Sequence, residues 1–357
     1  MSIPKKISGN HVSAASPISC TTLPTTCSSA PGRASLSLGR VRAELPIPPH
    51  FDPARVGAVW RIDYEARASD AAVWAERRGI RRADEDRFRT CLLAVDCQNT
   101  FCTPGFELFV PGAPGDSRRL CELVYRQLGR ITEIVATLDT HTVHQIFHAA
   151  FLVGRDGRHP PPYTTVSIAD VEEGVWRAAD PGRQEHLEDY IRELAAGGKY
   201  ELTIWPYHAM LGGVGHALVA AVEEAFFFHA VVRAAPTRFE SKGGDPLTEH
   251  YSILGPEVGG EPNRALVEHL ASFDAVLLAG QAKSHCVAWT VEDLLRLAPD
   301  LAPRLFLLED CTSPVVVPGA ADFTAPADAA FARFTAAGTH VVRSSDSPPA
   351  WLPPAPA

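Results

Sequence analysis

The chain has 357 residues, enough for one large domain or two small ones, and 46% of them are hydrophobic, which allows a sizeable core. A net charge of -9 indicates a soluble acidic protein and argues against nucleic acid as a partner. No apolar run approaches the ~20 residues of a membrane span, so a membrane partner is not expected either.

The first 43 residues differ in composition from the rest of the chain. They are rich in Ser, Thr and Pro, and no acidic residue precedes Glu44. We expect a disordered tail in preference to a transit peptide, because no long amphipathic basic helix is visible. The chain lacks the apolar region of a secretory signal, and its eight cysteines form no CxxC pair. Free thiols in the cytoplasm are therefore expected.

An alternation of strand-like and helix-like patterns begins near residue 90. Apolar runs predict strands at 91–95, 134–138, 230–232, 275–279, 305–308 and 339–342. Helical spacing predicts helices at 120–131, 215–227 and 325–337, and another after the strand at 275–279. This alternation predicts an α/β fold: a doubly wound, mainly parallel sheet of about six strands with helices on both faces.

The same pattern outlines the domain organisation. We expect one domain over residues 44–345, followed by a Pro-rich tail at 346–357. Within the domain, residues 151–204 form a long Pro-rich insertion with a predicted helix near 185–196. Ligands of such sheets bind beyond the carboxyl ends of the strands, where Asp96, Asp139 and Cys286 all lie. One crevice could gather these three side chains.

Cys286 is predicted in the first turn of the helix that follows the strand at 275–279. Gly280 ends the strand, Ser284 is a plausible N-cap, and Pro299 ends the helix. The N–H groups at such a helix start lower the pKa of a thiol and can hold an oxyanion, as a nucleophile requires. A buried, inert cysteine is the alternative, and position alone does not decide between them.

Other residues offer acid–base, metal-binding and cationic groups. Asp96 could act as a general base, although capping a turn is the commoner role of such an Asp. Asp139 and His141 offer a carboxylate and an imidazole suited to Zn²⁺, Mn²⁺ or Fe²⁺. His144 and His148 would form a second metal-binding pair if that segment were helical. Lys242 could stabilise a thiolate, since the glycines after it allow close backbone approach.

Taken in order, these motifs resemble the isochorismatase-like cysteine hydrolases, and specifically the nicotinamidases, over roughly residues 88–345. Asp-x-Gln-Asn-x-Phe begins at Asp96, Asp-x-His at Asp139, and Trp-Pro-x-His at Trp205. The catalytic Lys-Gly pair matches Lys242-Gly243, and Gly-x-Ala-x-x-x-Cys-Val begins at Gly280.

The resemblance implies a role for each matching residue. It implies a catalytic triad of Asp96, Lys242 and Cys286, and a non-proline cis peptide bond before Ala282. The backbone N–H groups of Ala282 and Cys286 would hold the oxyanion, and Phe101 and Trp205 would flank the substrate ring. The implied metal ligands are Asp139, His141 and His208, with Zn²⁺ expected and Mn²⁺ or Fe²⁺ as alternatives, and the metal would hold a pyridine nitrogen.

The chain departs from the family pattern at particular positions. Nicotinamidases usually carry a second His four residues after the His of Asp-x-His, where this chain has Gln145. The Asp usually found two residues before the nucleophile is Ser284. The resemblance gives His148 no ligand role, so His148→Ala is expected to affect metal binding less than His141→Ala.

The expected activity is a cysteine amidohydrolase that converts nicotinamide to nicotinate and ammonia through a thioester. Two alternatives stay open: a hydrolase of another small amide or carbamoyl compound, and a non-catalytic binding protein on the same fold. The expected partner is a small-molecule amide, and the oligomeric state, including a homo-oligomer, is open.

Overall fold

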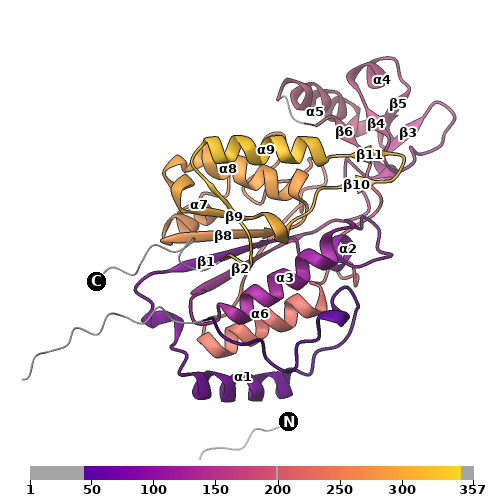
Figure 1. Ribbon diagram of the computed structural model, residues 1–357. Helices are drawn as coiled ribbons and strands as arrows, with labels where there is room; N and C mark the ends of the chain where they lie inside the picture. Colours follow the sequence, from indigo (N-terminus) through magenta and orange to yellow (C-terminus); the bar gives the residue numbers. More distant parts are fainter. Residues whose placement is uncertain (1–43, 198–199, 347–357) are drawn as a thin grey trace, which may run out of the picture. The chain divides into compact units, whose positions relative to one another are not determined.

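The computed structural model describes residues 44–197 and 200–346. Six parallel strands form its main sheet (Figure 1). In spatial order they are β12 (His340–Val342), β9 (Leu305–Leu308), β8 (Ala275–Gly280), β1 (Thr90–Val95), β2 (Glu133–Asp139) and β7 (Arg238–Lys242). The prediction of a parallel sheet of about six strands is confirmed. The tail predicted at 1–43, and that at 346–357 beyond its first residue, lie outside the described residues.

The centre of the sheet is apolar on both faces. All six residues of β1 and all six of β8 are buried, and the two strands pair in register from Thr90–Ala275 to Val95–Gly280. Continuous apolar strands of this kind are typical of parallel sheets, whose faces are both covered by helices.

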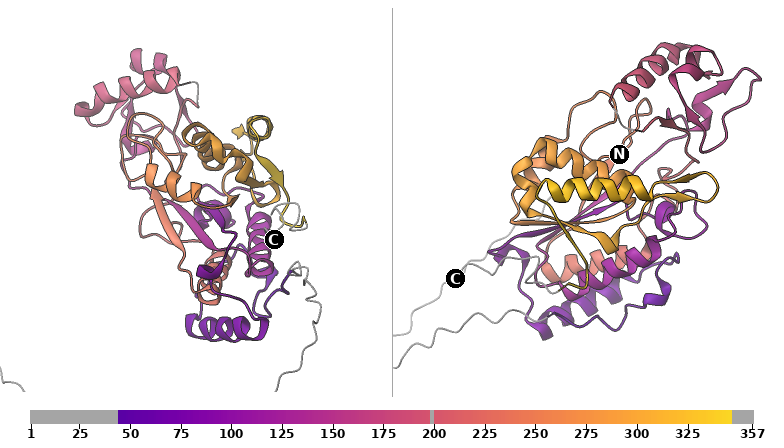
Figure 2. Two further views of the ribbon diagram at one scale, coloured as in Figure 1. Left: turned by 90° about the vertical axis from the view of Figure 1, so that its left-hand side faces the viewer. Right: turned by 45° about the horizontal axis from the view of Figure 1, so that its top comes forward.

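Helices cover the two faces of the sheet as a doubly wound fold requires. Figures 1 and 2 show α3 (Ala113–Arg126) and α6 (Ala220–Arg233) on one face, with α1 (Tyr64–Arg78) packed outside α6. The opposite face carries α7 (Arg264–Ala271), α8 (Ala288–Leu297) and α9 (Thr324–Ala336). Two buried hydrophobic clusters, one on each face, fill the space between helices and strands.

One predicted strand is wrong. Ala230–Val232 lies inside α6, which begins at Ala220 rather than 215 and continues to Arg233. Ala234 then ends the helix in the left-handed conformation, with φ of 51°. The sixth strand is instead β7, at the edge of the sheet beside β2. Its sequence Arg-Phe-Glu-Ser-Lys contains one apolar residue, so no apolar run marked it as a strand.

The order of the strands creates a switch point between β1 and β8. From β1 the chain builds outward through β2 to β7, and then returns to the other side of β1 to add β8, β9 and β12. In doubly wound sheets a ligand crevice forms at the carboxyl ends of the strands where this order reverses. Asp96 follows β1 and Cys286 follows β8, so both lie at this switch point.

The insertion at 151–204 forms small elements of its own, beyond the carboxyl end of β2 (Figures 1 and 2). Its strands are β3 (Leu152–Gly154), β4 (Thr165–Val166), β5 (Trp176–Ala178) and β6 (Leu202–Thr203), and they pair antiparallel as β3–β5 and β4–β6. Its helices are α4 (Ile168–Glu172) and α5 (Gln184–Ala196), the latter close to the predicted 185–196.

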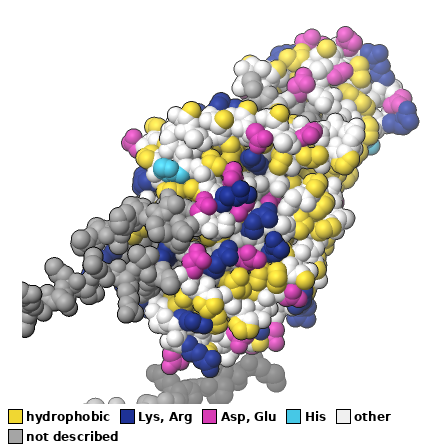
Figure 3. Space-filling view, viewed as in Figure 1, with side chains coloured by type: hydrophobic (Ala, Val, Ile, Leu, Met, Phe, Trp, Pro, Cys, Tyr) yellow, Lys and Arg dark blue, Asp and Glu magenta, His cyan; other side chains and the backbone are white. Residues whose placement is uncertain are grey.

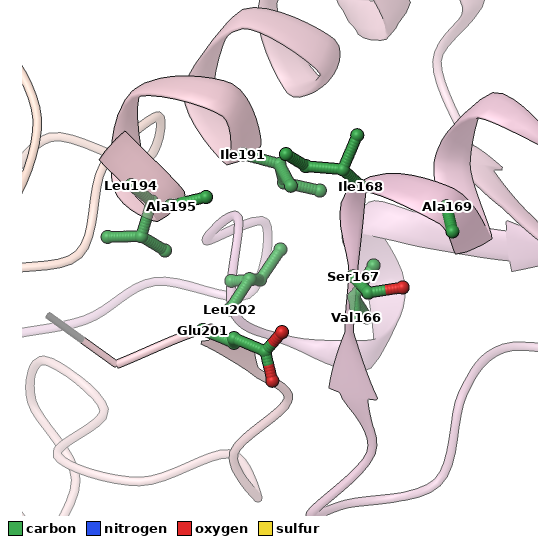
Figure 4. A pocket seen from close by; sticks show the side chains of 9 residues that line it. All are labelled: Val166, Ser167, Ile168, Ala169, Ile191, Leu194, Ala195, Glu201 and Leu202. Atoms are coloured by element: carbon green, nitrogen blue, oxygen red, sulfur yellow. The ribbon is translucent and has the colours of Figure 1, made fainter. Parts of the chain in front are cut away.

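A pocket of about 230 Å³ lies within this insertion, between α4, α5, β4 and β6 (Figure 4). Ile168, Ile191, Leu194 and Leu202 are among its mainly apolar lining residues. None of the predicted site residues lines it.

Within residues 44–197 and 200–346, no helix has both the length and the apolar character needed to cross a membrane. The six cysteines in these ranges are buried free thiols. On the face shown in Figure 3, acidic and basic side chains are interspersed. A short hairpin of β10 (Val316–Val317) and β11 (Ala321–Asp322) precedes α9.

Candidate active site

Four neighbouring strands bring the predicted catalytic residues to one edge of the sheet. Asp96 directly follows β1, Asp139 ends β2, Lys242 ends β7, and Cys286 follows β8 after a short turn. Asp139 and Lys242 are paired residues of the β2–β7 ladder, which places their side chains at the same height of the sheet. The structure therefore brings these groups together at one edge of the sheet.

The Lys242 ammonium lies between two carboxylates. Its Nζ is 3.1 Å from Asp96 Oδ2 and 2.7 Å from Asp139 Oδ1, and it donates a hydrogen bond of 2.8 Å to the His250 carbonyl. Burial alone would lower the pKa of Lys242, but the charges of Asp139 and Asp96 raise it well above its ordinary value. Lys242 is therefore a fixed positive charge rather than a base.

Asp96 is fully buried, and its backbone adopts a left-handed conformation. Its φ of 45° lies in the left-handed region, and its carboxylate accepts a hydrogen bond from the Thr137 hydroxyl. Burial raises the pKa of Asp96 above its usual value, while the Lys242 charge acts in the opposite direction. A carboxyl group with a raised pKa can both take and return a proton near neutral pH.

The nucleophile turn differs from the predicted helix start. Cys286 lies in a π-helical turn, Lys283–Val287, which leads into α8. Ala282, not Ser284, occupies the N-cap position, and the N–H groups of His285 and Val287 both donate to its carbonyl. Ser284 instead uses its hydroxyl to contact His285 Nδ1 at 2.8 Å and to accept from Val315 N. The peptide bond between Gln281 and Ala282 is cis, as the resemblance implies.

The Cys286 thiol is not acidified by its position. Burial raises its pKa well above the ordinary value, although the Lys242 charge acts to lower it. This direction is opposite to the one expected for a thiol at an exposed helix start, because Cys286 is only 7% exposed. The resting residue is a neutral thiol, which needs a base within reach to become a nucleophile.

Three histidines form a cluster beside the catalytic residues. His141, His148 and His208 are buried, and their ligand atoms lie within 4.8 Å of one another. Each Nδ1 contacts a backbone carbonyl: His208 O at 3.2 Å, Thr142 O at 3.0 Å and Pro206 O at 2.8 Å, respectively. A carbonyl accepts only from an N–H, so Nδ1 is the donor in each ring, and Nε2 carries a free lone pair whenever the ring is neutral. Metal-binding histidines commonly donate their other ring N–H in this way.

His148 gives a direct test of whether this cluster fits a metal ion. Its Nε2 is buried and has no hydrogen-bond partner within the described residues. Burial, together with the charges of His208 and His141, lowers the pKa of His148 to about 3, so the imidazole is neutral. A buried neutral imidazole with an unpaired lone pair, beside two others, fits a divalent transition metal.

Asp139 joins the histidine cluster to the catalytic residues. Its Oδ1 is 2.9 Å from His141 Nε2, and its Oδ2 is 3.6 Å from His208 Nε2. Burial would raise the pKa of Asp139, but the charges of His141 and Lys242 hold it well below its usual value. The carboxylate therefore stays ionised, with Oδ1 shared between Lys242 and His141 and Oδ2 toward His208.

Gln145 does not belong to the histidine cluster. It is buried, and its Nε2 donates a hydrogen bond of 2.6 Å to the carbonyl of Gly243, the residue after Lys242. The segment 142–148 is not helical, so His144 and His148 do not form the i, i+4 pair; His144 is exposed. Gly243 has φ of 78°, and a Cβ there would lie 2.8 Å from the His141 ring.

The two aromatic residues that were predicted to flank the substrate ring each contact a histidine of the site. Phe101 lies in the short helix α2 (Asn99–Cys102), with its ring edge-on to His208 at 5.7 Å between centroids. Trp205 contacts His285 in the same way at 5.6 Å.

His285, directly before the nucleophile, was not singled out from the sequence. It is buried, and its Nε2 has no hydrogen-bond partner in the described part of the chain. The rings of Tyr200 and Tyr251 also contact it. The sequence signal that could have singled out His285 is its place directly before the predicted nucleophile.

Comparison with known proteins identifies the fold. No family model matches the chain, and no curated protein matches its sequence. The yeast nicotinamidase, solved with the inhibitor nicotinaldehyde, is 21% identical with a TM-score of 0.51, and the match covers 71% of this chain and 99% of that one. A nicotinamidase/pyrazinamidase from Acinetobacter baumanii is 19% identical with a TM-score of 0.50, covering 73% and 99%. The chain has the fold of these two proteins.

Proposed function

We propose that the protein is a cysteine amidohydrolase that acts on a small carboxamide. The observation that carries this proposal is the buried set at the switch point. A thiol, a carboxyl group with a raised pKa and a fixed ammonium lie together at the carboxyl ends of β8, β1 and β7. The structural likeness to two nicotinamidases and the order of the sequence motifs support the same reading.

Asp96 and Cys286 share the proton movements of the first half-reaction. Asp96 takes the thiol proton, and the resulting thiolate attacks the carboxamide carbon. The Lys242 charge stabilises the thiolate against the burial that disfavours it. Backbone N–H groups of Ala282 and Cys286 hold the oxyanion of the tetrahedral intermediate. The C–N bond then breaks, and Asp96 returns the proton to the departing ammonia.

The second half-reaction regenerates the thiol. Asp96, now ionised, takes a proton from water, and the hydroxide attacks the thioester carbon. The C–S bond breaks, the carboxylic acid leaves, and the proton returns to Cys286. One carboxyl group serves as base and acid in turn, which agrees with its raised pKa.

The metal ligands in this proposal are Asp139, His141 and His208, joined by His148. Three imidazoles and a carboxylate suit Zn²⁺, with Mn²⁺ or Fe²⁺ as alternatives. A metal bound there would supply an electrophile for the ring nitrogen of a pyridine carboxamide. Because that contact orients the ring and does not polarise the carbonyl, the chemistry at Cys286 depends on the chain's own residues.

The finer proposal is that nicotinamide is the substrate and nicotinate the product. Phe101 and Trp205 lie beside His208 and His285, respectively, and would flank a flat ring. The yeast protein named above was solved with nicotinaldehyde, a compound with the same ring. Another small amide or carbamoyl compound is the competing substrate class, because the insertion adds aromatic side chains such as Tyr200 next to His285.

Ammonia release from purified protein tests the proposal. Nicotinamide, pyrazinamide, a carbamoyl amino acid and an aliphatic amide should be compared, each with and without a chelator. Turnover of nicotinamide that falls when the metal is removed is the expected result. If only the aliphatic amide were hydrolysed, nicotinamide would be rejected as the substrate. If no amide were hydrolysed, a binding protein would be indicated.

The nucleophile assignment is tested in the same assay. Cys286→Ala should abolish ammonia release, because no other group would form the thioester. Cys311→Ala is the matched control, since Cys311 is equally buried but lies after β9, away from the predicted triad.

A further inference from the structure

The insertion contacts both catalytic turns of the protein. On α5, the Tyr190 hydroxyl accepts a hydrogen bond of 3.0 Å from the Glu249 N–H, and His186 Nε2 lies 2.7 Å from the Leu247 carbonyl. Nearer the end of the insertion, the Tyr200 hydroxyl donates to the Ser284 carbonyl at 2.9 Å, two residues before the nucleophile. Each of these hydroxyl and imidazole groups contacts the backbone of one of the two catalytic turns, and the Tyr190 hydroxyl also hydrogen-bonds the Thr248 side chain.

The first of these loops, residues 243–250, holds the catalytic lysine. Lys242 Nζ donates to the His250 carbonyl at 2.8 Å, and Gly243 N donates to His250 Nδ1 at 3.0 Å. His250 therefore closes the loop back onto the residue that begins it. Glu249 precedes His250, so a single peptide unit separates the N–H that Tyr190 accepts from and the carbonyl that Lys242 uses.

The His250 carbonyl is the third acceptor of an ammonium that has three N–H groups. The other two acceptors are the carboxylates of Asp139, at 2.7 Å, and Asp96, at 3.1 Å. With the carbonyl in place, Nζ is held between the two carboxylates. If the carbonyl moved, the shorter and stronger contact would draw Nζ toward Asp139, away from Asp96 and the nucleophile.

Tyr190 is well placed to hold that carbonyl. Its side chain is only 1% exposed, and it is packed with Leu187, Ile191 and Leu194 of the same helix in the core of the insertion. A hydroxyl anchored in this way offers a fixed acceptor to a buried N–H group, which would otherwise be left unpaired.

We infer that Tyr190 is a positioning residue of the active site: through the Glu249 N–H it fixes the His250 carbonyl, and through that carbonyl the Lys242 ammonium. The insertion thus sets the geometry of the lysine, in addition to any contact with substrate. This inference rests on the catalytic role proposed for Lys242.

The test compares Tyr190→Phe with a matched control, Tyr125→Phe. Tyr125, on α3, is also buried; its hydroxyl is 3.2 Å from His50 Nε2, and its ring contacts Phe228 of α6. Tyr190→Phe should lower kcat about 10-fold or more, as misplacement of a catalytic group does, with KM changed by less than about twofold. Tyr125→Phe should leave kcat unchanged.

Alkylation of Cys286 by iodoacetamide at fixed pH provides a second measurement that needs no substrate. A displaced Lys242 stabilises the thiolate less, so Tyr190→Phe should be alkylated several-fold more slowly than wild type. His186→Leu, which loses the contact to Leu247 in the same loop, should be slowed in the same direction.

Two results would overturn the inference. One is wild-type kcat and alkylation rate in Tyr190→Phe. The other is an equal fall in kcat for Tyr125→Phe, which would reveal a general loss of stability. If wild type hydrolysed no amide, the proposed function would fail, but slower alkylation of Tyr190→Phe would still support the positioning of Lys242.

Discussion

Asp96 combines a left-handed backbone, complete burial and contact with the Lys242 ammonium. Asn tolerates the same backbone conformation, so Asp96→Asn should fold. It removes the carboxyl group that carries the Cys286 proton in the proposed mechanism, and kcat should fall about 10³-fold, within the range of general acid–base catalysis. Ammonia release measured on protein with a wild-type circular dichroism spectrum checks this. Activity within tenfold of wild type would assign the proton transfer to another group.

Metal binding should depend on His148 as much as on His141. The resemblance led us to expect a weaker effect, but the buried, unpaired Nε2 of His148 faces the same cluster. Metal content of purified His148→Ala, measured by mass spectrometry, should fall as far as that of His141→Ala. Exposed His144→Ala is the control and should retain wild-type occupancy. Full metal occupancy in His148→Ala would mean that the ligands are Asp139, His141 and His208 without His148.

At the residue scale, the motifs predicted which side chains meet. Asp96, Asp139 and Cys286 were assigned by their places after strands and Lys242 by the glycines that follow it, all four also by the family pattern, and the structure brings them together. The location of His148 could not be predicted, because it depends on an irregular turn at 142–148. The direction of the Cys286 pKa was also wrong, since burial cannot be read from the position of a residue at a helix start.

At the scale of elements, apolar runs predicted the four inner strands well and only one of the two edge strands. β1, β2, β8 and β9 lie within a residue or two of the predicted ranges, because each has a strand on both sides and needs apolar side chains. The edge strand β12 contains an apolar Val-Val pair and was predicted, whereas the edge strand β7 is mostly polar and was missed. The apolar Ala230–Val232 continues a helix, since a run of three cannot distinguish the two periods.

Gly280 is the element boundary most sensitive to substitution. Its φ is 112°, and a Cβ there would lie 1.9 Å from the Val95 carbonyl oxygen, at the carboxyl end of the β1–β8 ladder. Gly280→Ala should therefore destabilise the fold severely, as judged by the urea midpoint. Gly105→Ala is the control: its φ is 85°, but no atom lies within 4 Å of the added Cβ. It should cost only about 1–2 kcal/mol. Equal losses would mean that backbone strain alone, not the clash, decides.

The loop 243–250 should make stability depend on pH through Glu249. Burial raises the pKa of Glu249 to about 8, from an ordinary 4.5. The folded state therefore binds the proton more tightly, and this contribution is complete below about pH 4.5 and is lost as pH rises toward 8. Over that range wild type should lose at most about 1.4 kcal/mol per pH unit relative to Glu249→Gln, measured by urea unfolding. If the free energy of unfolding changed with pH equally in both proteins, the raised pKa would not belong to Glu249.

At the scale of the whole molecule, the alternation of elements predicted the fold class and the edge that carries the site. A parallel sheet with helices on both faces follows from strand–helix alternation, whatever the loops contain. The fold of the insertion did not follow, because its strands have two or three residues and carry no periodic signal. Its contacts with the catalytic loops come from single hydroxyl and imidazole groups, which composition does not reveal.

The place of β1 in the middle of the sheet has a consequence for synthesis on the ribosome. β8 begins 180 residues after β1 ends, and translation at about 5–20 residues per second leaves that side of β1 without its partner for roughly 10–40 s. During this interval Thr-Cys-Leu-Leu-Ala-Val is an open, apolar strand edge, the kind of surface that pairs with other chains. A chain ending at Asp274 should sediment as aggregate or remain bound to a chaperone, whereas one ending at Asp346 should stay in the supernatant. A soluble, monomeric 1–274 chain would mean that another segment shields β1 until β8 arrives.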